Sequence, residues 1–385
     1  MAAGRKGLEE MVAPVKTIVI SGYYGFRNSG DEAVLKSILT ALARAGNEAG
    51  IRIEPVVLSI DPEWTTSMYG VKAVHRMKLA EVRSAIQQSD GLISGGGSLL
   101  QDVTSPKTIP YYLGVLKLAQ WAKKPTFIYA QGVGPVQRKI FHPLIKSVFR
   151  KAAYISVRDE QSADLLSNMG IARGGIEVVP DPVMGLPLPE NTSSLPVSDS
   201  SNLPTIGVSV RYWDKECREL SALARGLRQL GERQPVHIRL LPFHLPDDVE
   251  ASREVMALVG SFSEGHSQIS IAEDVLDPQQ MLLEVSRCDL VIGMRLHSLI
   301  YAASRSIPLL GISYDPKIDH FLKRLGSEPV GNTTTLAAEQ LAAEAERIIK
   351  APMEWLRSRE AKIRELQEEA RRPAERIVHY LRDKG

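Results

Sequence analysis

The chain has 385 residues, of which 44% are hydrophobic and 24% charged, and its formal net charge is +2. This length exceeds what one hydrophobic core usually organises and indicates two domains, while the near-neutral charge argues against a nucleic-acid binder. The two cysteines, Cys217 and Cys288, have no Cys or His cluster around them, which argues against a disulfide scaffold or a structural zinc site and fits the reducing cytoplasm.

Residues 1–15 lack an apolar signal-peptide core and are predicted to be a disordered extension or a tag. Residues 16–186 alternate short apolar runs with longer amphipathic stretches, a pattern that predicts a parallel sheet covered by helices on both faces. The predicted strands are Thr17–Ser21, Ile53–Leu58, Gly91–Ser94, Thr126–Ala130, Tyr154–Val157 and Ile176–Val179. The predicted helices are Asp31–Arg44, Lys78–Gln88, Tyr111–Lys123, Lys139–Lys151 and Glu160–Met169.

Residues 187–204 are rich in Pro, Ser, Asn and Asp and are predicted to be a linker or an exposed loop. The same alternation resumes in residues 205–350, which predicts a second domain of the same kind. Its predicted strands are Thr205–Val210, Val236–Leu241, Asp289–Ile292 and Pro308–Ile312. Its predicted helices are Lys215–Leu230, Asp247–Val259, Pro278–Ser286, Leu296–Ala303 and Thr335–Lys350.

Residues 351–385 form an amphipathic C-terminal helix in this interpretation. Its apolar stripe could lie on a membrane or pack back onto the first domain, and the nearly balanced charges favour packing. No apolar run in the chain approaches the roughly 18 residues that span a bilayer. The stripe consists of Leu356, Ile363, Leu366, Ala370, Ile377 and Leu381.

We therefore predict an α/β protein of two Rossmann-like, doubly wound domains that face each other across a cleft. Ligands of such sheets bind at the carboxyl ends of the strands, so the loops after strands are the places to look for chemistry.

The loop after the first strand, residues 21–31, carries three glycines and ends at a helix. Glycines let the backbone approach a ligand, and a helix N-terminus attracts anions, so we expect Tyr24, Asn28 and Gly30 to line the cleft. The loop lacks the lysine of a P-loop and the spacing of a dinucleotide fingerprint. Asp31 is interpreted as the N-cap of the helix rather than as a catalyst.

A triple glycine, Gly95, Gly96 and Gly97, follows the strand Gly91–Ser94 and is a second candidate for ligand contact. Asp102 lies just beyond it, either as a solvated or capping carboxylate or as a base for a sugar hydroxyl. Gln131 follows the next strand and could bind a sugar or hold the backbone of its own loop.

Cationic side chains follow several strands of both predicted sheets. Arg158 could bind a ligand or pair with Asp159, and Lys317 could be a cleft cation or an ordinary surface lysine. Arg295 and His297 are two residues apart and project to one side of an extended segment, where a guanidinium would bind a carboxylate or phosphate and a histidine would transfer a proton. This concentration of cations in a nearly neutral chain predicts a small, highly anionic ligand. The residues predicted to bind this ligand are Arg158, Arg211, Arg295, His297, Ser298 and Lys317, and no carboxylate cluster suited to a metal ion is evident.

Five motifs in order along the chain resemble the polysaccharide pyruvyl transferase family, and the likeness runs from about Thr17 to about Gly326. The branch most similar in these motifs is the one that pyruvylates secondary cell-wall polymers of bacteria, the CsaB-like enzymes. The motifs are GYYGFRNSGDEA at 22–33, GGGSLLQD at 95–102, QGVGP at 131–135, VRD at 157–159 and MRLH at 294–297.

The resemblance implies a fold like that of the GT-B glycosyltransferases and a pyruvyltransferase that uses phosphoenolpyruvate as a substrate, without a cofactor. It implies a cyclic pyruvate ketal on a sugar diol, with Arg295 and His297 in donor binding and catalysis and with Asp102 and Arg211 as further family positions. The branch suggests N-acetylmannosamine in a lipid-linked cell-wall precursor as the acceptor, met by a cytoplasmic enzyme at the inner face of the plasma membrane, and a role in anchoring an S-layer.

Two alternatives remain open at this point. A nucleotide-sugar glycosyltransferase on the same fold would need a pocket for a base and a ribose. A non-catalytic glycan-binding protein would have no use for the Arg-x-His pair. The sequence does not indicate the oligomeric state.

Overall fold

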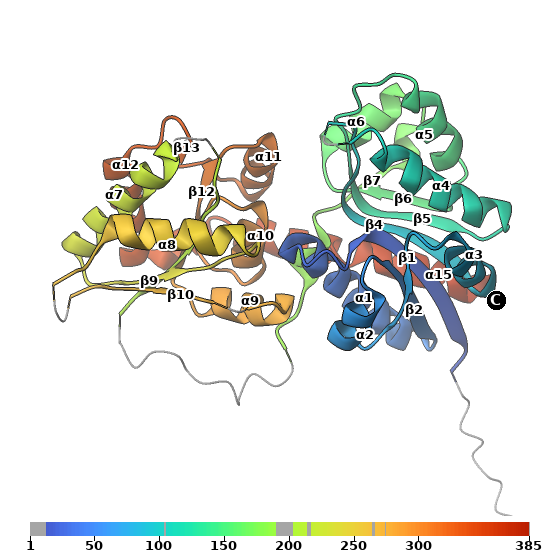
Figure 1. The fold of residues 1–385 in the computed structure, drawn as a ribbon, viewed down its shortest axis with the longest axis horizontal. Coiled ribbons are helices and arrows are strands. Elements are labelled where there is room, and N and C mark those ends of the chain that lie inside the picture. Colours follow the sequence, from blue (N-terminus) through green and yellow to red (C-terminus); the bar gives the residue numbers. More distant parts are fainter. Residues whose placement is uncertain are drawn as a thin grey trace, which may run out of the picture.

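In the computed structural model, which describes residues 13–103, 105–189, 203–213, 217–263, 266–273 and 275–384, the chain forms two α/β domains side by side (Figure 1). The strands of the first domain are β1 (Val15–Tyr24), β2 (Arg52–Ser59), β3 (Lys72–His75), β4 (Gly91–Leu100), β5 (Thr126–Val133), β6 (Tyr154–Val157) and β7 (Glu177–Val178). Its helices are α1 (Ser29–Ala49), α2 (Pro62–Tyr69), α3 (Leu79–Gln88), α4 (Thr108–Trp121), α5 (Phe141–Phe149), α6 (Glu160–Asn168) and the short η1 (Arg173–Gly175) and η2 (Pro182–Gly185).

The second domain repeats this architecture. Its strands are β8 (Thr205–Ser209), β9 (His237–Leu240), β10 (Gln268–Ile271), β11 (Leu290–Gly293), β12 (Leu309–Ser313) and β13 (Gly331–Asn332). Its helices are α7 (Arg218–Arg233), α8 (Asp247–Val259), α9 (Pro278–Ser286), α10 (Leu296–Ser304), α11 (Pro316–Leu325) and α12 (Ala338–Lys350). The predicted fold class, two doubly wound α/β domains, is confirmed.

Both sheets are parallel and reverse their strand order once. Among the described residues the first sheet runs β3-β2-β1-β4-β5-β6-β7, and the second runs β10-β9-β8-β11-β12-β13. The order reverses between β1 and β4 in the first sheet and between β8 and β11 in the second. The crevice outside such a reversal is where open α/β sheets bind ligands, and here both reversals carry the motif loops.

Alternating side chains of each first-domain strand supply two separate layers of core. Ile18 and Ile20 of β1 are fully buried on the side of α1, whereas Val19 between them belongs to the core under α3, α4 and α5. Because a strand's side chains point alternately to its two faces, this pattern fixes the register of the buried sheet. Helix α1 is itself bounded by an Asn28 cap and by Gly50, whose φ of 72° ends the helix in the left-handed conformation.

The C-terminal segment forms three helices, where one helical stripe was predicted: α13 (Pro352–Arg357), α14 (Glu360–Glu369) and α15 (Arg372–Asp383). Pro352 and Pro373 stand in the first turns of α13 and α15, positions that proline tolerates at a helix start but not in its interior. Helix α14 contacts η2 and also α10 and α11, and α15 packs against α1, β5 and β6 of the first domain (Figure 1). Its Tyr380 ring meets Phe127 of β5 edge to face at 5.3 Å.

Other predictions lie outside the described residues or differ in their bounds. Of the predicted extension and linker, residues 1–12 and 190–202 are not described. The strand predicted at Gly91–Ser94 continues as β4 to Leu100, because Gly97 and Leu100 remain paired with β5.

Candidate active site

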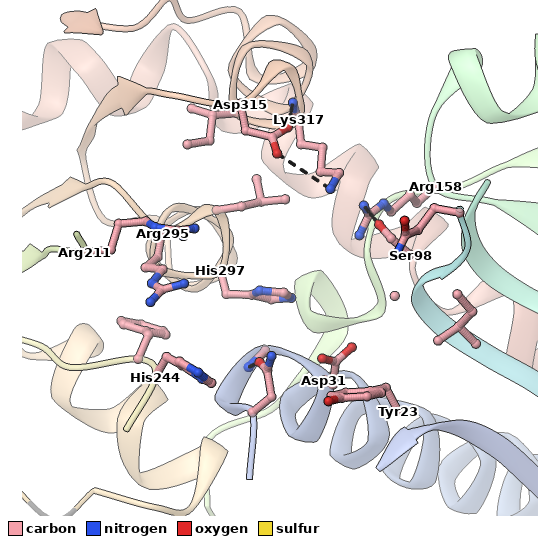
Figure 2. A pocket seen from close by; sticks show the side chains of 18 of the residues that line it. Tyr23, Asp31, Ser98, Arg158, Arg211, His244, Arg295, His297, Asp315 and Lys317 are labelled. Atoms are coloured by element: carbon pink, nitrogen blue, oxygen red, sulfur yellow. Dashed lines mark hydrogen bonds and ion pairs between the residues drawn. The ribbon is translucent and has the colours of Figure 1, made fainter. Parts of the chain in front are cut away.

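The carboxyl ends of the two sheets face a shared cavity of about 580 Å³. Figure 2 shows Tyr23, Asp31, Ser98 and Arg158 on the first-domain side, with the second-domain side chains opposite. The predicted residues that line the cavity are Asn28, Gly30, Gly97, Arg158, Arg211, Arg295, His297 and Lys317. The predicted residues outside its lining are Tyr24, Gly95, Gly96, Asp102, Gln131 and Ser298.

The first turn of α1 brings a carboxylate to the cavity. The cap of α1 is Asn28 and not Asp31, since the Asn28 Oδ1 accepts a hydrogen bond from the Gly30 N–H at 3.1 Å. Asn28 also forms an isolated antiparallel bridge with His244 of the second domain. Within the described part of the chain no hydrogen bond ties the Asp31 carboxylate, which lines the cavity (Figure 2).

The surroundings of Asp31 make it a proton acceptor near neutral pH. Burial, followed by the neighbouring carboxylate of Glu32, raises the pKa of the Asp31 carboxyl to about 7. Asp181 raises this pKa further, while Arg158 and Lys317 lower it without cancelling the shift. A carboxyl with a pKa near the working pH suits general base catalysis.

The three consecutive glycines have two different functions. A Cβ on Gly95 would lie 2.6 Å from the buried Tyr24 hydroxyl, and one on Gly96 would lie 2.2 Å from a valine of α1. These two glycines therefore let α1 and β1 pack closely on β4. Gly97, with a φ of 80°, lines the cavity, and a Cβ there would lie 2.8 Å from the Asp31 Oδ1. The third glycine thus makes room for the Asp31 carboxylate.

Asp102 and Gln131 hold loop backbone and neighbouring side chains instead of facing the cavity. The two carboxylate oxygens of Asp102 accept hydrogen bonds from the N–H groups of Gln137 and Arg138, each at 2.8 Å. Gln131 is fully buried, and its Oε1 accepts a hydrogen bond from the Ser94 hydroxyl at 3.1 Å.

Arg158 forms part of the first-domain wall of the cavity. Its Nη2 donates a hydrogen bond to the Ser98 hydroxyl at 2.6 Å, and a Cβ on Gly132 would lie 2.8 Å from its Nε. Its guanidinium also lies 3.6 Å from Asp159 and 3.9 Å from Asp181. The arginine is therefore fixed in position, and its charge is shared by two carboxylates.

Arg295 is held by a buried carboxylate. Its Nε donates to Asp248 Oδ2 at 3.0 Å, and its Nη2 donates to the other oxygen of the same fully buried carboxylate. Asp248 also accepts a hydrogen bond from the His244 N–H at 2.9 Å. The Ser298 hydroxyl is buried and donates to the Arg295 carbonyl at 2.7 Å, which supports the same turn from inside. The bidentate pair of Arg295 with Asp248 fixes the plane of the guanidinium at the cavity and balances its charge.

His297 lies against the first turn of α1 in the other domain. A Cβ on Gly30 would lie 2.4 Å from the His297 Nδ1, so only glycine leaves room for the ring. The His297 Nε2 is 3.8 Å from Asp181 Oδ2, and neither atom has a hydrogen-bond partner among the described residues. The ring is thus positioned between two domains with one nitrogen unsatisfied.

The His297 ring is neutral at neutral pH in the unliganded site. Burial lowers the pKa of the imidazole, and the neighbouring Arg158, Arg295 and Lys317 lower it further. Asp181 acts in the opposite direction but does not restore the ordinary value. An anion that pairs with these cations would raise the pKa again.

Among the described residues, Arg211 and Lys317 carry the least compensated positive charge in the cavity. The Arg211 Nη1 donates to the Tyr314 hydroxyl at 2.9 Å, and its guanidinium lies over the rings of Tyr314 and Trp213. In the described residues it forms no ion pair with a carboxylate. Lys317 has a looser pair, 3.7 Å from Asp315 (Figure 2).

Three carboxylates of this site were missed as functional residues by sequence reasoning. Asp31 is the first of an adjacent acidic pair, and the second, Glu32, accepts hydrogen bonds from the Gly25 N–H and the Tyr69 hydroxyl. Asp181 lies three residues after β7, so its position just beyond a strand was a usable signal. Asp248 lies in the first turn of α8, after β9, whereas its partner Arg295 follows β11. Nothing in the sequence indicated that these two residues meet.

No group of three or more His, Cys, Asp or Glu side chains that could hold a metal ion occurs in the described ranges. The same part of the chain contains no helix with both the length and the apolar character to cross a bilayer.

Comparison with known proteins gives one family and one recurrent fold. Residues 28–316 match the family model described as polysaccharide pyruvyl transferase. The amylovoran biosynthesis protein AmsJ of Erwinia amylovora is 22% identical over 274 residues, which are 64% of this chain and 62% of that protein. The match therefore spans less than two thirds of the relative's length.

Similar solved structures include two UDP-N-acetylglucosamine 2-epimerases. The enzyme from Methanocaldococcus jannaschii has a TM-score of 0.64 at 12% identity, with 96% of this chain and all of that chain covered (100%). A putative enzyme from Listeria monocytogenes has a TM-score of 0.62 at 13% identity, with 94% of each chain covered. At these identities the likeness shows a shared GT-B-like two-domain fold and nothing about the ligand.

Proposed function

Because the chain belongs to the polysaccharide pyruvyl transferase family, we propose that it transfers the pyruvyl group of phosphoenolpyruvate to two hydroxyls of one sugar in a polysaccharide precursor. The product is a cyclic pyruvate ketal, and the phosphate is released. N-acetylmannosamine in a lipid-linked precursor of a secondary cell-wall polymer, at the cytoplasmic face of the membrane, is the acceptor proposed from the motif resemblance. The amylovoran protein among the relatives supports a role in polysaccharide synthesis.

The observation that supports this proposal is the charge of the cavity. Arg158, Arg211 and Lys317 line it, and in the described residues Arg211 has no carboxylate partner. Phosphoenolpyruvate offers a carboxylate and a phosphate to such donors, and charge-assisted hydrogen bonds to both would orient the molecule. A compact anion of this kind needs no pocket for a base and ribose.

The first chemical step uses His297 as the acid. Pairing of the donor with the surrounding cations raises the pKa of the imidazole, so that the ring gains a proton as the donor binds. His297 gives this proton to the methylene carbon of the enol phosphate, and the adjacent carbon becomes electrophilic. Asp181, 3.8 Å from the His297 Nε2, stabilises the imidazolium before transfer.

The next steps form two C–O bonds and break one. A sugar hydroxyl attacks the electrophilic carbon and gives its proton to a carboxylate base, a role for which the structure supports Asp31 in place of the predicted Asp102. The C–O bond to phosphate then breaks, and the phosphate leaves with the proton that the carboxylate base took from the first hydroxyl, which restores the base. The second sugar hydroxyl attacks the same carbon and returns a proton to His297, which closes the ketal and restores the acid.

The test is a single incubation of the full chain with phosphoenolpyruvate and a glycan acceptor. We expect stoichiometric phosphate and a ketal methyl group that, in deuterated water, carries one deuterium from the exchangeable His297 site. We expect Asp31→Asn and His297→Gln to lose turnover, whereas Asp102→Asn, assayed where it is folded, keeps it. Release of a nucleoside diphosphate from a nucleotide sugar, with no phosphate from phosphoenolpyruvate, would disprove the proposal.

A further inference from the structure

One segment of the chain, residues 103–157, contains no aspartate or glutamate. It carries nine lysines and arginines in a chain whose total charge is +2, so the remaining residues sum to −7. The nine are Lys107, Lys117, Lys123, Lys124, Arg138, Lys139, Lys146, Arg150 and Lys151. Such a one-sided distribution creates a local positive field even though the whole protein is nearly neutral.

The fold gathers this segment on one face of the first domain. Helices α4 and α5 pack against each other, and Figure 1 shows them on the side of the first sheet opposite to α1 and α15. Ile109 and Leu116 of α4 and Ile145 of α5 are buried in the core beneath, which leaves the opposite faces of both helices outward.

Large apolar side chains lie exposed among these cations. Val103, Trp121, Ile140 and Leu144 are between 50% and 73% exposed. Ile140 and Leu144 are four residues apart and therefore share one face at the start of α5. Asp102 binds the N–H groups of Gln137 and Arg138, which places its neighbour Val103 beside that same helix start.

The far end of α4 shows the same combination. The Lys117 ammonium lies 6.0 Å from the Trp121 ring centroid, and Trp121 lines a hollow together with Leu79 and Arg83 of α3. Lys123, Lys124 and Lys151 line a separate hollow at the amino ends of β5 and β6, where Asp90 pairs with Lys16 at 3.9 Å. Exposed apolar side chains with Lys or Arg nearby thus occur at both ends of a two-helix surface, about 20 Å apart by the rise of a 14-residue helix.

We propose that the outward faces of α4 and α5 form a docking surface for an anionic lipid bilayer. Ile140, Leu144 and Trp121 enter the interfacial region, and the surrounding lysines and arginines pair with lipid phosphates. A second copy of the chain, docked symmetrically through the same surface, would place like charges against each other. Nucleic acid would be favoured by a row of stacking aromatics, whereas three of the four exposed side chains are aliphatic.

The position of this surface next to the cavity suggests how membrane docking would serve the reaction. Thr108, the first residue of α4, lines the cavity, so the docking surface begins at the rim of the site. This use rests on the proposed function, in which the acceptor sugar is attached to a lipid. Docking would then present the first-domain side of the cavity to acceptors that extend from the membrane.

The experiment is co-sedimentation of the full chain with vesicles of phosphatidylcholine alone or mixed with phosphatidylglycerol, in the absence of donor and acceptor. We expect binding only to the anionic vesicles, with release as ionic strength rises from about 0.1 M to about 1 M, which shortens the screening length from about 10 Å to about 3 Å. The double variant Ile140→Glu/Leu144→Glu should lower the partition coefficient at least tenfold. The matched control, Leu258→Glu/Leu276→Glu, alters second-domain leucines that are 46% and 48% exposed and should bind like wild type.

Several results would overturn the inference. The first two are that the wild type does not bind anionic vesicles, or that the two double variants bind them equally. The third is that the wild type is a dimer which does not bind vesicles and which the Ile140/Leu144 substitutions dissociate. The fourth is that the wild type binds duplex DNA and anionic vesicles do not displace it. Pyruvyl transfer to a water-soluble acceptor should be unchanged in the Ile140/Leu144 variant. Failure of docking would leave that transfer intact, and failure of the proposed transfer would leave vesicle binding intact.

Discussion

Replacement of Asp31 by asparagine should stabilise the protein while it abolishes turnover. Because burial raises the pKa of the Asp31 carboxyl from 3.8 to about 7, ionisation of this group disfavours the folded state. The resulting loss of stability is absent below about pH 4, grows as the pH rises to about 7, and is constant above. At about 1.4 kcal/mol per unit the full shift corresponds to ~4 kcal/mol, and we expect about half of it because water enters the cavity.

The assay is urea denaturation of wild type and Asp31→Asn at pH 4 and pH 8. We expect a free energy of unfolding about 2 kcal/mol higher for the variant at pH 8 and nearly equal values at pH 4. Asp102→Asn is the matched control with the opposite sign. Burial acts to raise the pKa of Asp102, but the N–H groups of Gln137 and Arg138 outweigh it and the pKa is lowered, so this variant should be less stable at pH 8. If Asp31→Asn were destabilised at pH 8 or kept wild-type turnover, its assignment as a buried base would be wrong.

Three further predictions concern the second-domain wall and the contact between domains. Binding of phosphoenolpyruvate at about pH 7 should take up more protons in wild type than in His297→Gln, because donor binding raises the pKa of His297 as well as that of Asp31. Titration calorimetry in buffers of different ionisation enthalpy measures this uptake, and identical uptake in both proteins would contradict it. Asp248→Asn leaves the guanidinium of Arg295 without its buried partner and should lower the free energy of unfolding, measured by urea denaturation, by about 3 kcal/mol. A decrease of less than about 1 kcal/mol would contradict this prediction. Gly30→Ala should reduce kcat at least tenfold with the fold retained, since a Cβ there would lie 2.4 Å from His297, whereas Gly114→Ala, where a Cβ meets nothing within 4 Å, should not; equal kcat values would show that the ring position is unimportant.

The sequence was sufficient to predict the architecture because the central strands of both sheets are short, nearly continuous apolar runs, whereas the edge strands β3, β10 and β13 lack such runs and were not predicted. Ile18, Val19 and Ile20 are buried on both faces of the sheet. Such apolar runs between amphipathic helices are typical of a parallel sheet covered by helices on both faces. Strand ends were less predictable. Glycine has a low strand propensity, so Gly97 was assigned to a loop, but its pairing with Gln131 of β5 keeps it in β4.

The site was predictable where chemistry follows a strand directly, and not where it depends on tertiary packing. Arg295 and His297 follow β11 and line the cavity. Asp102 also follows a strand, but its carboxylate accepts hydrogen bonds from the backbone N–H groups of Gln137 and Arg138 and does not line the cavity. Asp31 and Asp248 are ordinary first-turn acidic residues in the sequence, and only the docking of the two domains gives them their neighbours.

The measurement that tests the central claim most directly is calorimetric titration of phosphoenolpyruvate into wild type and Arg211→Gln. The variant removes charge-assisted hydrogen bonds worth about 1.5–3 kcal/mol, which corresponds to a roughly 10–100-fold weaker Kd. We predict saturable binding of phosphoenolpyruvate to wild type, weakened by that factor in the variant, and no binding of UDP-N-acetylglucosamine. Equal affinity of both proteins for phosphoenolpyruvate, or binding of the nucleotide sugar alone, would contradict the claim that this cavity is built for a small anion.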